Sequence, residues 1–251
     1  MRTRLGGTVG RINRFFTEKG LCSRREADKL VEQGRVGING RIAVHGDQIQ
    51  SGDVVTLDGK AVGQEQPKPV ILAYNKPVGV ECTSDMRKKN NIIDAVAYPE
   101  RVFHIGRLDQ MSEGLILLTN QGDIVNKILR GRYGHEKEYI VDFDAPVSEA
   151  AARRLARGVD IGDERGPTKE CIAELQGPSR LRIVLTEGRN RQIRRMAEAI
   201  DNRVKRLKRI RILNIRLGHL KTGQFRHLTD REERELFERL DNAVATNFGE
   251  T

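Results

Sequence analysis

The sequence predicts an α+β protein in two parts: a small unit of two helices and short strands, then a larger domain with a mixed, mainly antiparallel sheet and flanking helices. Two patterns support this prediction. Up to residue 62, helix caps and tight glycine turns follow one another at short intervals. From Val70 onward, apolar and alternating runs typical of strands are interleaved with helical periodicity. A polar, proline-bearing stretch at residues 63–69 separates the two parts and is expected to be a linker.

The small unit is expected to open with two short helices. The first has its apolar stripe within residues 12–16 and stops at Gly20. The second opens at a capping box, in which the Ser23 hydroxyl accepts from the Glu26 amide and the Glu26 carboxylate accepts from the Ser23 amide. The Asn-Gly pair at 39–40 and the Asp-Gly pair at 58–59 then indicate turns between short strands.

The larger domain alternates strands with helices. Residues 115–118 are wholly apolar, as in a strand buried on both faces, and residues 137–143 alternate apolar and polar side chains, as in a strand with one buried face. Further strands are expected at residues 70–74 and 181–185. Helices are expected at residues 123–129 and 191–200. In the second, apolar side chains recur at the spacing of a buried helical stripe.

These elements divide the chain into five expected segments. They are a flexible N-terminus (1–10), the small unit (11–62), the linker (63–69), the large domain (70–240) and a flexible tail (241–251). A polar linker makes independent movement of the two units the physical default, and a monomer is expected.

Charge is distributed unevenly along the chain. The 251 residues carry 45 Lys and Arg against 35 Asp and Glu, a formal net charge of +10. Residues 180–216 alone hold 13 of these bases and three acids, which equals the whole excess (13 − 3 = 10). Such a concentration is typical of a surface that binds a polyanion, most simply a nucleic acid. The alternative is a solvated charged face without a partner.

Several classes of protein and reaction are disfavoured. No apolar run reaches membrane-spanning length and the first ten residues lack the apolar core of a secretory signal, so the cytoplasm is the expected location, with no membrane partner. The three cysteines lie too far apart for a disulfide framework or a metal site. The sequence contains neither a phosphate-binding or dinucleotide-binding glycine motif nor a zinc-spaced His/Cys cluster. Nucleotide hydrolysis, dinucleotide redox chemistry and zinc-dependent deamination are therefore disfavoured.

Three segments supply side chains suited to chemistry on RNA. Asp109 lies in a loop just before the apolar strand, and Tyr139 lies near the start of the alternating one. The third segment, residues 185–196, joins a strand to a basic helix. Taken singly, each has an ordinary explanation: a loop aspartate is usually a cap, a strand tyrosine usually lies in the core, and helix arginines are usually solvated. Their occurrence together favours a catalytic site.

The small unit resembles the S4 RNA-binding domain. The likeness rests on Arg11-Ile-Asn-Arg, Cys22-Ser-Arg-Arg-Glu-Ala-Asp, Gly34-Arg-Val, Ile38-Asn-Gly and Gly52-Asp-Val. In that family the second helix and the loop after it present basic side chains to structured RNA. The resemblance implies phosphate contacts at six arginines: Arg11, Arg14, Arg24, Arg25, Arg35 and Arg41. The alternative for Arg24 and Arg25 is that they only solvate a helix start, where positive charge is unfavourable.

The larger domain closely resembles the pseudouridine synthases, in the branch that carries an N-terminal S4 domain and modifies ribosomal RNA. Gly106-Arg-Leu-Asp109, continued by Ser112-Glu-Gly-Leu115, is similar to the catalytic-aspartate motif of that family. Asn75-Lys-Pro-Val-Gly79 and Lys137-Glu-Tyr139 are similar to two further motifs. The third motif of the family usually reads Gly-Arg-x-His-Gln-(Ile/Leu)-Arg, but Arg191 stands at the histidine position, as in the sub-branch that acts on large-subunit rRNA.

The resemblance implies a role for each of these residues. Asp109 would be the catalytic carboxylate, Tyr139 would stack on the flipped base, and Arg194 would form the ion pair with Asp109. Substrate contacts are implied for six further residues: Lys76, Arg107, Leu115, Arg189, Arg191 and Ile193. For Leu115 and Ile193, plain core packing is an equal alternative.

The implied reaction converts a specific uridine of ribosomal RNA, with 23S large-subunit rRNA favoured, to pseudouridine. Nothing is oxidised or hydrolysed, so neither a cofactor nor a metal is expected. Asp109 acts either as the nucleophile at C1′ or as the base that takes the 2′ proton, and the sequence leaves both roles open. Two alternatives remain: a non-catalytic S4-type rRNA-binding or assembly factor, and the same isomerisation on tRNA. The partner is free rRNA or a pre-ribosomal particle.

Overall fold

A computed structural model describes residues 8–63, 68–129 and 134–248. Contacts between residues divide the chain into a small unit, Met1–Val70 with Pro99–Val102 and Asn120–Gly122, and a large unit formed by the remaining residues. The linker expected at 63–69 falls mostly on residues 64–67, which lie outside the described residues. Within the described ranges, every helix is too short or too polar to cross a bilayer.

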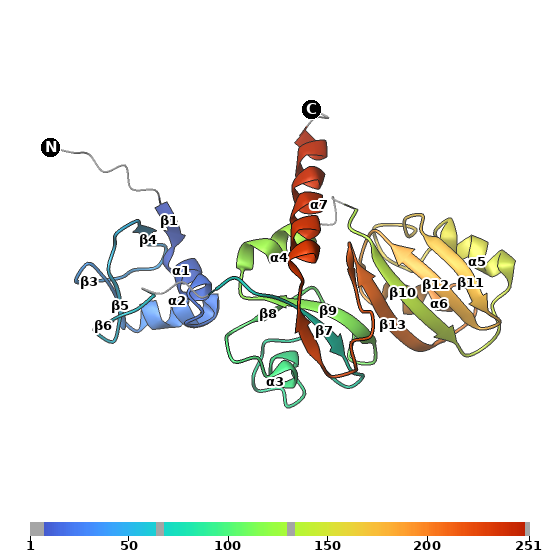
Figure 1. The fold of residues 1–251 in the computed structure, drawn as a ribbon, viewed down its shortest axis with the longest axis horizontal. Coiled ribbons are helices and arrows are strands. Elements are labelled where there is room, and N and C mark those ends of the chain that lie inside the picture. Colours follow the sequence, from blue (N-terminus) through green and yellow to red (C-terminus); the bar gives the residue numbers. More distant parts are fainter. Residues whose placement is uncertain (1–7, 64–67, 130–133, 249–251) are drawn as a thin grey trace. The chain divides into compact units, whose positions relative to one another are not determined.

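The small unit consists of two helices and two small sheets (Figure 1). Its elements are β1 (Thr8–Arg11), α1 (Ile12–Glu18), α2 (Arg24–Glu32), β2 (Val36–Ile38), β3 (Arg41–Ile42), β4 (Gln48–Gln50), β5 (Val55–Leu57) and β6 (Lys60–Ala61). Strands β3-β2-β5-β6 form one antiparallel sheet, and β1 pairs with β4. The prediction of two helices and short strands is confirmed. Residues 8–10, expected to be flexible, instead belong to β1, because they find a pairing partner far along the chain.

Capping and packing fix the two helices of the small unit. The Glu26 amide donates to Ser23 Oγ at 3.2 Å and the Ser23 amide donates to Glu26 Oε2 at 2.7 Å, which is the predicted capping box. Ile12 and Phe16 of α1 pack with Ala27 of α2 in one buried cluster. Burying an Ile or Phe side chain contributes about 1.5–3 kcal/mol. The polar face of α2 is left to solvent.

The large unit is built on one long mixed sheet (Figure 1). Its elements are β7 (Ile71–Lys76), α3 (Ile92–Val96), β8 (Phe103–Ile105), β9 (Glu113–Thr119), α4 (Gly122–Leu129), β10 (Lys137–Phe143), α5 (Glu149–Ala156), β11 (Ile172–Gly177), β12 (Arg180–Leu185), α6 (Gln192–Glu198), β13 (Val204–Ile212), β14 (Ile215–Arg216), β15 (Phe225–His227) and α7 (Asp230–Phe248). The strand order is β11-β12-β10-β13-β9-β7-β15. The pairs are antiparallel except for β13 with β9, so the predicted mixed, mainly antiparallel sheet is confirmed.

Strands β9 and β13 join the two halves of this sheet. They run parallel, with Lys208 opposite Glu113 and Arg209 opposite Gly114. A Cβ atom on Gly114 would lie 2.2 Å from the carbonyl oxygen of Arg209, and φ of this glycine is +103°. Only glycine fits such a close approach of two backbones. The junction brings the loop before β9, residues 106–112, beside β10 and β13.

Helices α4 and α7 cover one face of β7 and β9. Ile71 and Leu117 from the strands pack with Ile124 of α4 and Leu236 of α7 in one buried cluster. In Figure 1, α7 rises next to α4 above the sheet. The flexible tail expected from residue 241 instead begins inside α7, which runs to Phe248. The sequence patterns did not predict this end of the helix, because much of α7 faces solvent and its sequence is polar.

Strand β13 is the main element that the sequence patterns did not predict. Five of its nine residues are Lys or Arg, so its sequence was interpreted as part of a basic surface. The strand is nevertheless central in the sheet, and two of its cations pair with acids on neighbouring strands. Arg206 forms an ion pair with Glu113 of β9, and Arg211 forms one with Glu138 of β10.

Candidate active site

Asp109 and Tyr139 line one cavity of about 970 Å³ in the large unit. The loop at 106–112 contributes Asp109, strand β10 contributes Tyr139, and the loop at 187–191 forms another wall. A smaller hollow of about 80 Å³ shares Asp109 and Tyr139 with this cavity and is also lined by Ile193. The three segments singled out in the sequence therefore meet at one place.

Two cations, the buried Lys76 and the partly buried Arg194, hold the Asp109 loop by its main-chain carbonyls. Lys76 is fully buried, and its Nζ donates to three carbonyl oxygens, including that of Gln110 at 3.3 Å. Burial lowers the pKa of Lys76. Arg194, on α6, donates through Nη2 to the carbonyl of Met111 at 2.9 Å. Both residues after Asp109 are thus fixed, which restricts where the carboxylate can lie.

Arg194 also faces the carboxylate itself. Its Nε lies 3.9 Å from Oδ2 of Asp109, and the two side chains are 13% and 33% exposed. Nε is buried and has no hydrogen-bond partner among the described residues. Burial lowers the pKa of Arg194, the charge of Arg191 adds to this, and the charge of Asp109 opposes it. The buried donor that lacks a partner is therefore the one nearest to the Asp109 carboxylate.

Tyr139 is held by its neighbours across the sheet. It lies opposite Ile183 of β12 and opposite Arg209 of β13, and it is 8% exposed. Val141 and Phe143, on the same face of β10, are buried in the core. The aromatic ring is thus a fixed part of the cavity wall, and a base stacked on such a ring gains about 1–3 kcal/mol.

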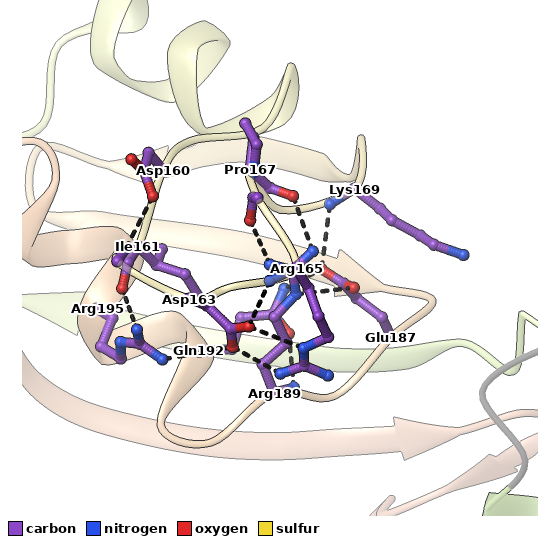
Figure 2. Close-up of polar contacts among 12 residues, drawn as sticks. Asp160, Ile161, Asp163, Arg165, Pro167, Lys169, Glu187, Arg189, Gln192 and Arg195 are labelled. Atoms are coloured by element: carbon purple, nitrogen blue, oxygen red, sulfur yellow. Dashed lines mark hydrogen bonds and ion pairs between the residues drawn. The ribbon is translucent and has the colours of Figure 1, made fainter.

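A further loop, residues 160–169, is tied to the loop at 187–191 (Figure 2). Arg189 makes this connection: it donates to the carbonyl of Gly166 at 2.5 Å and its Nε pairs with Glu187 at 3.1 Å. Its side chain is only 4% exposed. The phosphate contact implied for Arg189 stays a prediction, and these internal partners do not favour it.

The remaining implied substrate contacts differ in exposure. Arg107 and Arg191 are exposed, line the cavity and form no ion pair within the described part of the chain. Ile193 is 4% exposed and lines the smaller hollow. Leu115 and Leu117 are both fully buried in the core, and Leu117 also lines the cavity. The side chains best placed to meet a substrate are therefore Arg107, Arg191 and Ile193.

The six arginines of the small unit fall into two groups. Three of them pair with an acid at 2.6–2.7 Å: Arg14, Arg35 and Arg41. The other three are exposed and form no ion pair with any described residue: Arg11, Arg24 and Arg25. Exposed ion pairs contribute little free energy, so a phosphate can replace the acid at small cost. RNA binding by either group stays a prediction.

Many basic side chains in the stretch at 180–216 have acidic partners within the protein, which the composition alone does not indicate. Seven of its bases lie within ion-pair distance of an acid: Arg180, Arg182, Arg189, Arg194, Arg195, Arg206 and Arg211. Glu138, for example, pairs with Arg182 at 2.8 Å and with Arg211 at 2.6 Å. Seven of the 13 bases in this stretch therefore have acidic partners within the protein, so the charge available to RNA is smaller than the composition indicates.

Two cavity residues were missed by the sequence patterns. Lys137 lies two positions before Tyr139, so the two side chains share a face of β10, and this spacing was a usable signal. Arg209 is 3% exposed and also lines the cavity. No local pattern marks Arg209, because its position depends on the pairing of β13 with both β10 and β9.

This arrangement is suited to chemistry on a nucleotide. A carboxylate beside a guanidinium can act as a nucleophile or as a base. The ring of Tyr139 can hold a planar base, and exposed arginines at the same cavity can bind phosphate oxygens. The fold and the site thus define an enzyme that acts on RNA.

Comparisons with known proteins agree with this conclusion. Residues 70–199 match the RNA pseudouridylate synthase family, and residues 10–55 match the S4 domain. The chain is 46% identical to the dual-specificity RNA pseudouridine synthase RluF of Escherichia coli (strain K12). The matched 234 residues are 93% of this chain and 80% of the relative. It is 33% identical to the ribosomal large subunit pseudouridine synthase B of Bacillus subtilis, over 90% of this chain and 95% of the relative. A crystal structure of a pseudouridylate synthase matches with a TM-score of 0.66 and 30% identity, over 90% of this chain and 99% of that one.

The chain belongs to the RNA pseudouridylate synthase family and carries an S4 domain at the N-terminal end of its catalytic domain. Its substrate is RNA, and its reaction is the isomerisation of uridine. The family resemblance inferred from the sequence motifs is confirmed.

Proposed function

We propose that this enzyme isomerises a specific uridine of large-subunit 23S rRNA, with Asp109 acting on a nucleotide flipped out of its stack. One observation carries the proposal: Asp109 and Tyr139 line the same cavity, and the unpaired Nε of Arg194 lies 3.9 Å from the Asp109 carboxylate. The choice of large-subunit rRNA is supported by Arg191 at the family's histidine position and by the name of the relative from Bacillus subtilis.

Binding begins with extrusion of the target uridine. Unstacking and unpairing cost a few kcal/mol, and stacking on the Tyr139 ring offsets about 1–3 kcal/mol of this. Arg107 is exposed, lies two residues before Asp109 and lines the cavity, so it can occupy the vacated stack or bind a flanking phosphate. The exposed arginines of the small unit add phosphate contacts outside the cavity.

Catalysis requires an ionised carboxylate in a partly dry cavity. Burial disfavours ionised carboxylates, and an opposite charge within about 4–6 Å counters that effect. Arg194 supplies this charge at 3.9 Å. Asp109 then either attacks C1′ or removes the 2′ proton, and in both routes the bond between N1 and C1′ breaks. The uracil turns, C5 joins C1′, and the C5 proton leaves, with the Tyr139 phenol as its route.

A second candidate function is the same isomerisation on tRNA. The observation that favours it is that the 46% identical relative is named a dual-specificity RNA pseudouridine synthase. We propose a monomer that acts in the cytoplasm on free rRNA or on pre-ribosomal particles. Membership of an enzyme family argues against a purely structural RNA-binding role.

The proposal is tested by mapping pseudouridine at single-nucleotide resolution in rRNA and tRNA of cells that lack the gene. We expect at least one site in large-subunit rRNA to disappear, and a parallel loss in tRNA would add the second function. Wild-type protein should restore the site and Asp109→Asn should not. Asp144→Asn is the matched control, because Asp144 is exposed and lies outside the cavity, and it should restore the site. Restoration by Asp109→Asn, or an unchanged map, would contradict the proposal.

A further inference from the structure

Two cations, the half-buried Lys137 and the buried Arg209, share the cavity with Asp109 and Tyr139. Arg209 is 3% exposed, and its Nε donates to the carbonyl of Leu115 at 2.7 Å. Its Nη2 is buried and has no hydrogen-bond partner among the described residues. Within those residues, no acid lies within ion-pair distance of this guanidinium. Arg209 therefore carries a buried positive charge that the described protein does not neutralise.

Lys137 is half-buried and also lacks an acidic partner among the described residues. Its Nζ donates to the carbonyl of His135 at 2.9 Å, and no acid in the described ranges pairs with it. Burial lowers the pKa of Lys137 to about 8, and the charge of Arg209 adds to this effect. At neutral pH the side chain is still mostly protonated. Two like charges thus line one cavity and repel each other, which is costly unless an anion joins them.

A β-bulge in strand β13 sends Arg209 to this place. Glu138 of β10 lies opposite Arg211, but the next residue, Tyr139, lies opposite Arg209, so the register shifts at Ile210. In a regular strand, residues two apart share a face. The bulge lets Arg211 pair with Glu138 at 2.6 Å on one face and places Arg209 on the other, beside Tyr139. Bulges next to active sites commonly redirect a side chain in this way.

Both cations lie within reach of a base stacked on Tyr139. Lys137 is two residues away on the same face of β10, a separation of about 7 Å along a strand. Arg209 is the cross-strand partner of Tyr139, and the Cβ atoms of such partners are about 4.5–5.5 Å apart. The cations therefore flank the position proposed for the uracil ring, which is separate from the position of its C1′ atom at Asp109.

The reaction creates a negative charge at that ring. When the bond between N1 and C1′ breaks, its electron pair stays on the uracil, whether Asp109 forms an ester bond to C1′ or takes the 2′ proton. The detached uracil is then an anion whose charge is shared by N1, O2 and O4. The charge disappears when C5 donates an electron pair to C1′. In the ester route the bond between Asp109 and C1′ breaks in this step, and in the other route Asp109 returns the proton to C2′. C5 then loses its proton and N1 gains one.

We propose that Lys137 and Arg209 form a cationic subsite that binds the uracil anion through its carbonyl oxygens and thereby stabilises the transition state of glycosidic bond cleavage. The subsite rests on the function proposed above. The uracil anion would neutralise the two cations, and one of its oxygens would accept a hydrogen bond from Nη2 of Arg209, which has no partner among the described residues. Fixed charges aimed at a place where charge develops are often the largest contribution to catalysis.

The test measures the single-turnover rate of uridine rearrangement at saturating rRNA fragment, together with the Kd for the same RNA. Lys137→Met should lower the rate about 100-fold, the usual effect of removing one such donor, and change Kd less than about threefold. Lys137→Arg keeps the charge and should recover most of the rate. Lys127→Met is the matched control, because Lys127 is an exposed lysine of α4 that pairs with Asp241 at 3.0 Å, and it should behave as the wild type.

A substrate with 5-fluorouridine at the target position separates catalysis from structure. Fluorine withdraws electrons and makes the uracil a better leaving group, so glycosidic cleavage needs less cationic help. Because C5 of this nucleotide carries fluorine and has no proton to lose, the rate compared for both RNAs is that of cleavage of the bond between N1 and C1′. The loss of this rate in Lys137→Met should shrink to about tenfold or less with the fluorinated RNA. Equal losses with both RNAs would overturn the subsite, and so would a weaker Kd with an unchanged rate, which would assign the cations to an RNA phosphate. A wild-type protein that rearranges no rRNA uridine would overturn the proposed function and the subsite with it.

Discussion

Nε of Arg194 lies 3.9 Å from Oδ2 of Asp109, while Nη2 of the same guanidinium donates to the carbonyl of Met111 at 2.9 Å. One side chain of α6 thus faces the carboxylate and also holds the loop that carries it. A guanidinium can do both because its donors point in several fixed directions from one plane, whereas an ammonium is a single compact charge.

Arg194→Lys should therefore impair catalysis more than binding. The charge near Asp109 is kept, but the loop loses a contact, and a displacement of about 1 Å can cost about 100-fold in rate. Single-turnover assays on saturating RNA should show a loss of this order, with a nearly unchanged Kd. Arg154→Lys, on the exposed side of α5, is the control. A weaker Kd with a normal rate would place Arg194 in RNA binding instead.

Gly114→Ala should destabilise the catalytic domain by about 3 kcal/mol or more. A left-handed φ costs an alanine about 1–3 kcal/mol, and its Cβ would lie 2.2 Å from the Arg209 carbonyl oxygen. Gly122→Ala is the control, because a Cβ there meets no atom within 4 Å, and its effect should stay within about 1 kcal/mol. Urea unfolding measures both variants. Equal stability of Gly114→Ala and the wild type would rule out the close junction of β9 and β13.

Lys137→Met should make the folded protein more stable at pH 7. Because the pKa of Lys137 falls from 10.5 to about 8 on folding, the unfolded chain binds more protons between these values, and wild-type stability rises with pH across that window. The cost of burying the charge is full below pH 8 and vanishes above pH 10.5. The advantage of Lys137→Met should therefore be largest at pH 7 and shrink at pH 9.5. A pH-independent difference in urea unfolding would contradict this account.

Substitutions of Arg191 and Arg189 should have different effects, one on RNA binding and the other on stability, although the two residues are only two positions apart. Arg191 is exposed at the cavity, so Arg191→Met should weaken RNA binding and reduce the slope of log K against log salt by about one. Arg189 is buried against Glu187 and Gly166, so Arg189→Met should mainly lower the free energy of unfolding. Fluorescence titrations at several salt concentrations, with urea unfolding of both variants, test the contrast. If Arg191→Met left the slope of log K against log salt unchanged, Arg191 would not contact an RNA phosphate.

The sequence predicted those parts of the fold that local patterns determine. The capping box at Ser23 and the strand at residues 137–143 form where they were expected, because a cap needs residues three apart and a strand needs only alternation. Asp109 and Tyr139 were chosen from motifs, and the fold brings them to one cavity. Helix α7 was interpreted as a tail from residue 241 because its exposed surface weakens the apolar periodicity.

Charged residues were the main source of error. A single arginine can be a free surface charge, half of an ion pair or a buried cation, and the sequence alone does not distinguish these cases. Arg211 and Arg209 have the same local pattern, yet the bulge in β13 gives Arg211 a partner in Glu138 and leaves Arg209 buried without one among the described residues. The pairing of distant strands decides between these outcomes, and the local spacing of residues does not predict that pairing.

The central claim is that the Asp109 carboxylate performs the chemistry in a site whose structure does not depend on its charge. The most direct measurement is tritium release from 5-tritiated uridine in rRNA by Asp109→Asn, alongside the Kd for that RNA and the free energy of unfolding. We expect no release above background, with Kd and stability close to those of the wild type and of the Asp144→Asn control. Release by Asp109→Asn at the wild-type rate would contradict the account.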